Sequence, residues 1–350
     1  MREQKIILLA LILVSMALLP LLVDTGLRAG DENVELQEAK NYFNEGKFSD
    51  AINLLERLVV TRTVSKQDYV EASEYLAVAY VSIGQDPRAE EVFVRVLEKS
   101  PDYKPADLWW PHKRLMAGYY RSVKKAGKSL NIGAQSPGIK TIAIIDFENN
   151  SIDDVEKYAN LGGALSKILI SDFSVLSNLK VVERERLQFL VDELELTVKE
   201  IGGKRVVDPA SAPQLGKLLG AHSFVFGSFM KLGNTFRIDA RLVKTETGEI
   251  FKTASVEGKP DKIIALAKEL TLKITQDMDV AIGKVKRKRL DKMGKYNIPI
   301  EAVALFGDAM SRANEEDYKN AVVKLEAALV LAPDFRKAQD MMTVIRPLTL

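Results

Sequence analysis

The strongest constraint on the fold is an alternation of short apolar runs with longer amphipathic stretches between residues 139 and 282. Short apolar runs bounded by turn residues are typical of strands, and apolar residues at every third or fourth position are typical of helices. Their order predicts a strand, a helix, a strand, two helices, three strands and a final helix. We therefore expect an α/β fold in which helices pack against a mixed sheet.

Local signals place these elements. Asp153-x-x-Glu156 can cap a helix that runs through Phe173, and Asp208-Pro209 can begin another that runs to Leu219. Gly162-Gly163 would let the first of these helices approach the sheet closely. Strands are expected at residues 179–182, 222–231, 236–243 and 250–257. Tight turns at Gly233-Asn234 and Thr247-Gly248 would join the last three strands. Two further helices are expected, one through Leu187 and Leu194 and a last one at residues 260–280.

Four separated motifs carry a family resemblance. They are Ile142 to Ser151, Tyr158 to Ser166, Val181 to Leu187 and Leu242 to Glu249. In order and spacing they resemble the CsgG family, the curli production assembly and transport proteins of the bacterial envelope. The resemblance implies a CsgG-like mixed sheet with packed helices at residues 139–282. In or beside the motifs we single out five residues, which we interpret as structural: Asp146, Glu183, Arg184, Arg241 and Gly248.

Residues 1–30 have the composition of an export signal. Arg2 and Lys5 precede an apolar run from Ile6 to Val23. Pro20 favours a cleaved signal peptide, whereas Leu27-Arg28-Ala29 is a poor cleavage site, so a signal peptide and an uncleaved signal anchor both stay open. In either case we expect the rest of the chain in the periplasm, soluble or tethered by this segment. The family resemblance adds outer-membrane association as an alternative.

All-α helical repeats are expected on both sides of the α/β domain. Small and large apolar residues recur between Leu36 and Val59 and again between Ala72 and Pro101, at offsets that resemble the tetratricopeptide repeat. A third copy runs from Ala309 to Pro333. The expected order is a signal segment (1–30), N-terminal repeats with a capping helix near Trp109 and Trp110 (31–127), a linker (128–138), the CsgG-like domain (139–282), a basic linker (283–297) and a C-terminal repeat (298–350).

Enzyme motifs are missing from the sequence. The 350 residues include no cysteine, which excludes disulfides, thiolate metal sites and a lipidated cysteine. His112 and His222 are the two histidines, and neither belongs to a two-histidine metal motif. Gly127-Lys128-Ser129 follows a helix rather than a strand, so it is no phosphate-binding loop. We therefore predict a protein that is not an enzyme, with no catalytic residue, no metal site and no cofactor.

Two function classes remain. The preferred one is a non-catalytic periplasmic adaptor or assembly factor, in which the CsgG-like domain docks and the repeats bind a partner; outer-membrane activators of peptidoglycan synthases are similar to this fold without being channels. The alternative is an outer-membrane secretion or assembly component of the curli type, an oligomeric ring that exports fibre subunits. Arg237, Asp239 and Arg241 load one face of a strand with charge, which argues against a lipid-facing role for it.

The partner is expected to be an envelope protein or peptide, and a homo-oligomer is a further option. In the usual repeat geometry the concave face would present a polar groove for an extended or helical peptide. The basic run at residues 283–297 could contact an anionic lipid or envelope polymer, although a solvated linker is the preferred interpretation. The net charge of +2 argues against nucleic acid as a partner. The candidate groove residues are Lys40, Asn44, Glu74 and Ser82.

Overall fold

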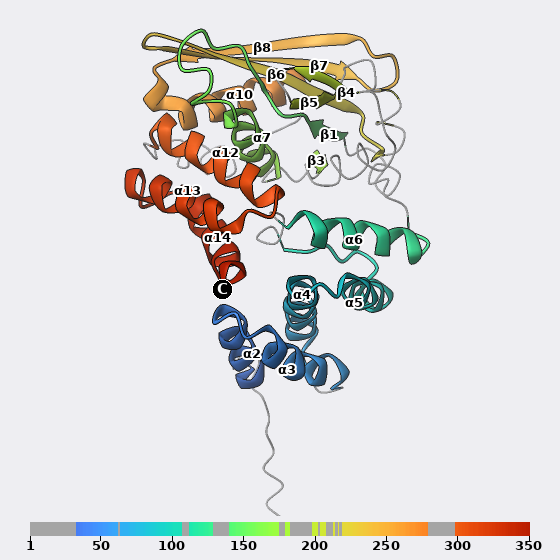
Figure 1. Cartoon of the computed structure of the whole chain (residues 1–350). Helices are drawn as coiled ribbons and strands as arrows, with labels where there is room; N and C mark the ends of the chain where they lie inside the picture. Colours follow the sequence, from blue (N-terminus) through green and yellow to red (C-terminus); the bar gives the residue numbers. More distant parts are fainter. Residues whose placement is uncertain are drawn as a thin grey trace, which may run out of the picture.

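The computed structural model describes residues 33–61, 64–106, 112–128, 140–174, 179–182, 198–201, 204–207, 219–278 and 298–350, together with Pro213 and Gly216. The sheet lies at the top of Figure 1, and the N-terminal helices and the C-terminal helices both lie below it. Among these residues no helix combines the length and the apolar character needed to cross a membrane. The predicted signal segment, Trp109, Trp110, Glu183, Arg184 and the basic linker lie outside the described residues.

The N-terminal part is a run of helices, each packed against the next. Side-chain caps begin two of them: Asn33 accepts a hydrogen bond from Leu36 N at 3.1 Å, and Ser65 accepts one from Asp68 N at 3.0 Å. Gly46 follows the first helix with a φ of 72°, a conformation that glycine adopts at little cost. The helices are α2 (Val34–Asn44), α3 (Phe48–Val60), α4 (Lys66–Ser82), α5 (Asp86–Lys99) and α6 (Lys113–Lys125).

The middle part of the sequence forms a mixed sheet. Its strands are β1 (Lys140–Ile144), β2 (Glu148–Asn149), β3 (Leu179–Val182), β6 (Ser223–Leu232), β7 (Thr235–Lys244) and β8 (Ile250–Gly258). They lie in the order β3-β1-β6-β7-β8, with β2 beside β6. β1 is parallel to β3 and β6, whereas β7 is antiparallel to β6 and β8. The three long strands and both tight turns confirm the sequence prediction for this region.

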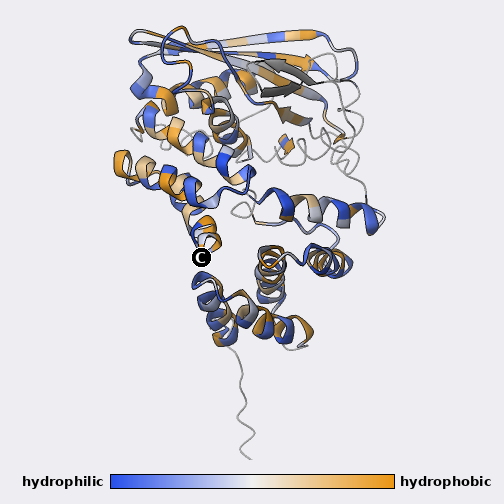
Figure 2. Cartoon of the chain, viewed as in Figure 1, coloured by the Kyte–Doolittle hydropathy of each residue, from blue (hydrophilic) through white to orange (hydrophobic). Residues whose placement is uncertain are grey.

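One face of the sheet is covered by α7 (Leu161–Ser174) and α10 (Ile263–Asp277), which follows the short 3-10 helix η3 (Pro260–Lys262). Apolar side chains of α7, α10 and the sheet form one buried cluster, and Figure 2 shows hydrophobic residues concentrated there. A Cβ on Gly162 would come within 1.8 Å of the Phe147 carbonyl oxygen. Glycine at this position therefore lets α7 lie close to the chain after β1, as predicted. On the other face, Ile145 and Phe224 join the apolar cluster of the N-terminal helices.

The C-terminal helices share the core of the central domain. They are α12 (Ile300–Asn314), α13 (Tyr318–Leu331), α14 (Arg336–Ile345) and the 3-10 helix η4 (Arg346–Thr349). A Cβ on Gly307 would lie 2.3 Å from the Asn160 carbonyl oxygen, so this glycine allows α12 to pack against α7. Asn160 also donates from Nδ2 to Asp308 Oδ1 at 2.8 Å. From there α14 and η4 run back toward α2 (Figure 1).

Some predicted boundaries are wrong. The helix expected from Asp153 begins at Leu161. The Asp153 carboxylate instead accepts a hydrogen bond from Gly233 N at 2.6 Å, in the β6–β7 turn, and Asp154 has a φ of 55°, which a right-handed helix cannot contain. The hairpin of β4 (Val198–Ile201) and β5 (Lys204–Val207) was also not predicted, although Gly202-Gly203 between these strands is a hairpin signal.

Candidate protein-binding surfaces

The predicted groove residue Lys40 connects two helices. Its Nζ atom lies 2.8 Å from Glu71 Oε1 on α4, with the two side chains 21% and 35% exposed. The same ammonium group lies 5.7 Å from the ring centroid of Tyr75, and Tyr75 meets Phe43 edge-on at 5.2 Å. Burial raises the pKa of the Tyr75 hydroxyl. Lys40 therefore holds α2 against α4 and is only partly available to a ligand.

Glu74 departs from the prediction because it is buried, with 7% of its surface exposed. Its Oε1 atom accepts hydrogen bonds from the Tyr103 hydroxyl at 3.1 Å and from Ala106 N at 2.9 Å. The Tyr119 hydroxyl in turn donates to the Tyr103 carbonyl oxygen at 2.7 Å. The Glu74 carboxylate therefore binds the segment after α5 to α4, and it is not exposed to a peptide ligand. Periodicity alone could not show that a later segment would cover this face of α4.

Asn44 and Ser82 are the two groove residues that the structure leaves exposed. Asn44 is the last residue of α2, and Ser82 is the last residue of α4. The Ser82 hydroxyl donates to the Val78 carbonyl oxygen at 2.9 Å, so its oxygen can still accept a further hydrogen bond. The part of the predicted groove that a partner can reach is therefore at the ends of these two helices.

A contact between α6 and α13 links the two helical parts. Arg114 Nη1 lies 3.5 Å from Glu316 Oε2 in the turn before α13. Beside this pair the rings of His112 and Tyr318 lie 5.7 Å apart, with His112 only 2% exposed. Burial lowers the pKa of the His112 imidazole to about 3 and raises the pKa of the Tyr318 hydroxyl to about 12. The imidazole is therefore neutral at ordinary pH and serves as a packing group.

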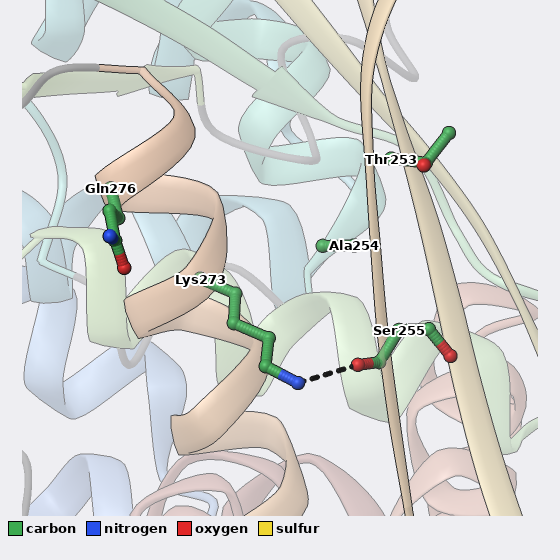
Figure 3. Close-up of a pocket in the computed structure, with 5 residues that line it drawn as sticks. All are labelled: Thr253, Ala254, Ser255, Lys273 and Gln276. Atoms are coloured by element: carbon green, nitrogen blue, oxygen red, sulfur yellow. Dashed lines mark hydrogen bonds between the residues drawn. The ribbon is translucent and has the colours of Figure 1, made fainter.

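A polar cavity lies between the edge strand β8 and α10 (Figure 3). Its volume is about 340 Å³. Lys273 reaches across it and donates from Nζ to the Ser255 carbonyl oxygen at 2.9 Å. No described strand pairs with the outer edge of β8, so this lysine occupies a carbonyl that would otherwise face solvent. The cavity is lined by Thr253, Ala254, Ser255, Lys273 and Gln276.

A second cavity of about 340 Å³ lies between α5 and α6. The Glu90 side chain lines this cavity and is 11% exposed. It accepts hydrogen bonds from Arg121 Nε at 2.7 Å and from Lys125 Nζ. Burial would raise the pKa of the Glu90 carboxyl, but the hydrogen bonds from Lys125 and Arg121 hold it below its ordinary value. The cavity is lined by Glu90, Glu91, Val94, Arg95 and Lys125.

The described motif residues lie on different segments of the sheet region. Asp146 is half-buried in the connection between β1 and β2, and Arg241 is exposed on β7. Gly248 has a φ of 72° in the β7–β8 turn, which accounts for a glycine there. On the exposed face of β7, Arg237 and Asp239 form an ion pair at 2.8 Å. The positive φ supports a structural interpretation of Gly248.

A buried ion pair joins α7 and α10. Lys268 Nζ donates to Asp172 Oδ1, and the two side chains are 8% and 0% exposed. Such a pair is costly to break, because either partner alone would be a buried uncompensated charge. Within the part of the chain that the structure describes, no group of three or more His, Cys, Asp or Glu side chains is arranged to hold a metal ion.

Several solved structures are similar to part of the chain. Lipoprotein GNA1162 from Neisseria meningitidis is 15% identical, with 34% of this chain and 79% of that chain covered and a TM-score of 0.26. The LpoB C-terminal domain from Escherichia coli is 14% identical, with 44% and 99% covered and a TM-score of 0.29. A PelC dodecamer from Paraburkholderia phytofirmans is 10% identical, with 43% and 93% covered and a TM-score of 0.25.

Family comparison agrees with three of the four motifs, and the motif from Leu242 to Glu249 lies beyond the matched range. The profile described as "Curli production assembly/transport component CsgG" matches residues 125–237. This range begins at the end of α6 and includes β1, α7 and β6. No curated protein matches the chain. Residues 125–237 thus carry a CsgG family domain, set between helices that the family profile does not include.

Proposed function

We propose that this chain is a non-catalytic protein of the bacterial cell envelope, an adaptor or assembly factor that binds other proteins. The observation that carries the proposal is the CsgG family match at residues 125–237, embedded between helices. In this arrangement the CsgG-like domain is the docking module. An envelope location agrees with the export signal in the sequence of residues 1–30, and the chain acts in the periplasm, soluble or tethered by that segment.

The flanking helices are proposed to be tetratricopeptide-like repeats. Successive helices are joined by short turns, and small residues lie where paired helices touch, all of them at most 1% exposed. This is the packing expected of repeats, whose function is commonly to hold a protein or peptide. The small residues are Ala39, Ala51, Ala77, Ala89, Ala309, Ala321 and Ala328.

The binding face is proposed to lie around Asn44 and Ser82, the exposed part of the groove. Its partner is an envelope protein or peptide. The basic linker at residues 283–297 can add contact with an anionic lipid or envelope polymer, and nucleic acid is not a partner.

Cross-linking in intact envelopes tests the proposal. Asn44→Arg should reduce capture of the cross-linked partner. Asn53→Arg, which changes another exposed asparagine, on α3, should not. Exposed substitutions of this kind usually change stability by only about 0.5 kcal/mol, and circular dichroism verifies that both variants fold. Equal capture by both variants would exclude this face. Protease added to spheroplasts should degrade the protein; protection until lysis would exclude the periplasm.

The alternative is a secretion or assembly component of the curli type, which the family description itself favours. That function would need several copies in a ring. Light scattering on the purified chain of 38.9 kDa distinguishes the two proposals. A single closed oligomer of high order supports the ring, and a monomer supports the adaptor.

A further inference from the structure

The first helix pair is in contact with a distant part of its own chain. A Cβ on Gly46, in the turn between α2 and α3, would lie 2.7 Å from Leu350 Cβ and 3.2 Å from Leu350 Cδ1. Leu350 therefore sits directly over Gly46, which follows Asn44 by two residues. η4 contacts α2 as well. The chain thus places its own residues beside the exposed end of the predicted groove.

The contact has an apolar basis. Val344, near the end of α14, is 1% exposed and belongs to the apolar cluster of the N-terminal helices. Pro347 is buried, and Leu348 is half-buried against both this cluster and the core of the central domain. The segment is therefore a defined turn that presents aliphatic side chains to the helical array.

Contacts with α13 and within η4 stabilise the conformation of this segment. Arg346 Nη2 lies 2.7 Å from Glu326 Oε1 on α13, and the Thr349 hydroxyl donates to the Arg346 carbonyl oxygen at 2.8 Å. Leu350 itself is 77% exposed. The contact of Arg114 with Glu316 joins the two helical parts independently. Displacement of the segment therefore does not require the two parts to separate.

We propose that residues 346–350 are an intramolecular ligand of the helical array, and that a partner segment of the same chemistry competes for this face. Such a segment is a short turn with two leucine-type side chains two positions apart, like Leu348 and Leu350. This inference rests on the proposed function and names the kind of partner that it takes. A ligand that binds only the uncovered state has an apparent affinity equal to its intrinsic affinity multiplied by the fraction of molecules in that state.

The test uses a fluorescent peptide with the sequence of residues 336–350, and fluorescence anisotropy with the full chain. Leu350→Asp should bind the peptide about tenfold more tightly than the wild type, which corresponds to a face covered about 90% of the time. Val330→Asp is the matched control, because Val330 is 80% exposed on α13, and it should bind like the wild type. A peptide with serine at both leucine positions should bind none of the three.

A second experiment uses a covalent cross-link to hold Leu350 against the turn after α2. Because the chain has no cysteine, Glu45→Cys with Leu350→Cys can be bridged by a short bis-maleimide, and the bridged protein should not bind the peptide. Equal affinity in the wild-type, Leu350→Asp and bridged forms, or no binding to Leu350→Asp, would overturn the inference. Partner capture in the envelope that persists under either result leaves the proposed function standing, so the two failures are distinguishable.

Discussion

Gly162→Ala tests how closely α7 approaches the chain after β1. The added Cβ would lie 1.8 Å from the Phe147 carbonyl oxygen and 2.9 Å from its carbonyl carbon, both of which are backbone atoms. Overpacking costs about 1–3 kcal/mol, and the upper end applies because backbone cannot rotate away. Alanine recovers about 1 kcal/mol through helix propensity. We expect a net loss of about 2 kcal/mol, or about 4–8 °C in melting temperature for a domain of this size.

Gly118→Ala is the matched control. Gly118 also lies inside a helix, but its Cβ would meet nothing closer than Glu90 Cγ at 3.5 Å, an ordinary contact. This variant should gain up to about 1 kcal/mol. Thermal unfolding followed by circular dichroism measures both changes, and hydrogen exchange assigns the loss to β1 and α7. If Gly162→Ala melts at or above the wild type, the close approach described here is wrong.

Three further predictions concern buried ionisable groups. Lys268→Met should lower the free energy of unfolding, measured by urea titration, by about 3–5 kcal/mol. Adding Asp172→Asn should recover part of this loss, because it removes the uncompensated charge. A double variant no more stable than Lys268→Met would contradict the buried ion pair. Glu90→Gln should reduce stability more at pH 7 than in acid, because the pKa of this carboxyl is lowered from 4.5 in the folded state. The carboxylate is therefore stabilising above pH 4.5, and this contribution is lost as pH falls through the folded pKa. His112 has a folded pKa of about 3 against an ordinary 6.5, so the unfolded state binds the proton first and stability falls as pH drops below 6.5. The wild-type melting temperature should therefore decline more steeply between pH 6.5 and pH 4 than that of His112→Gln, and parallel profiles would refute the assignment.

The long strands were predictable because their signals are local. Alternating apolar residues and the turns at Gly233 and Gly248 define β6, β7 and β8 within one or two residues. The start of α7 was not predictable in this way. Asp153 has the sequence of a helix cap, but its carboxylate accepts a hydrogen bond from a turn that lies far along the chain. A capping residue in the sequence therefore predicts a helix start only when its side chain is not bound by a donor from a distant part of the chain.

The candidate groove shows the same limit. Repeat periodicity places Lys40, Asn44, Glu74 and Ser82 correctly on α2 and α4. It does not show that Tyr103 and Ala106 would bond to Glu74, or that Leu350 would lie over Gly46. Those contacts depend on segments that lie outside the core positions of the predicted repeats. The motif residues Glu183 and Arg184 lie outside the described residues, so their structural interpretation stays a prediction.

The contact of Leu350 with Gly46 also has a consequence for the order of folding. Nearly the whole described chain separates these two residues, and contacts of such long sequence separation form late because closing a long loop is entropically unfavourable. The N-terminal helices, whose contacts with each other are local, can fold as soon as they leave the ribosome. During that interval their apolar face is uncovered. A chaperone or a partner that meets the growing chain therefore encounters the open face before residues 346–350 can cover it.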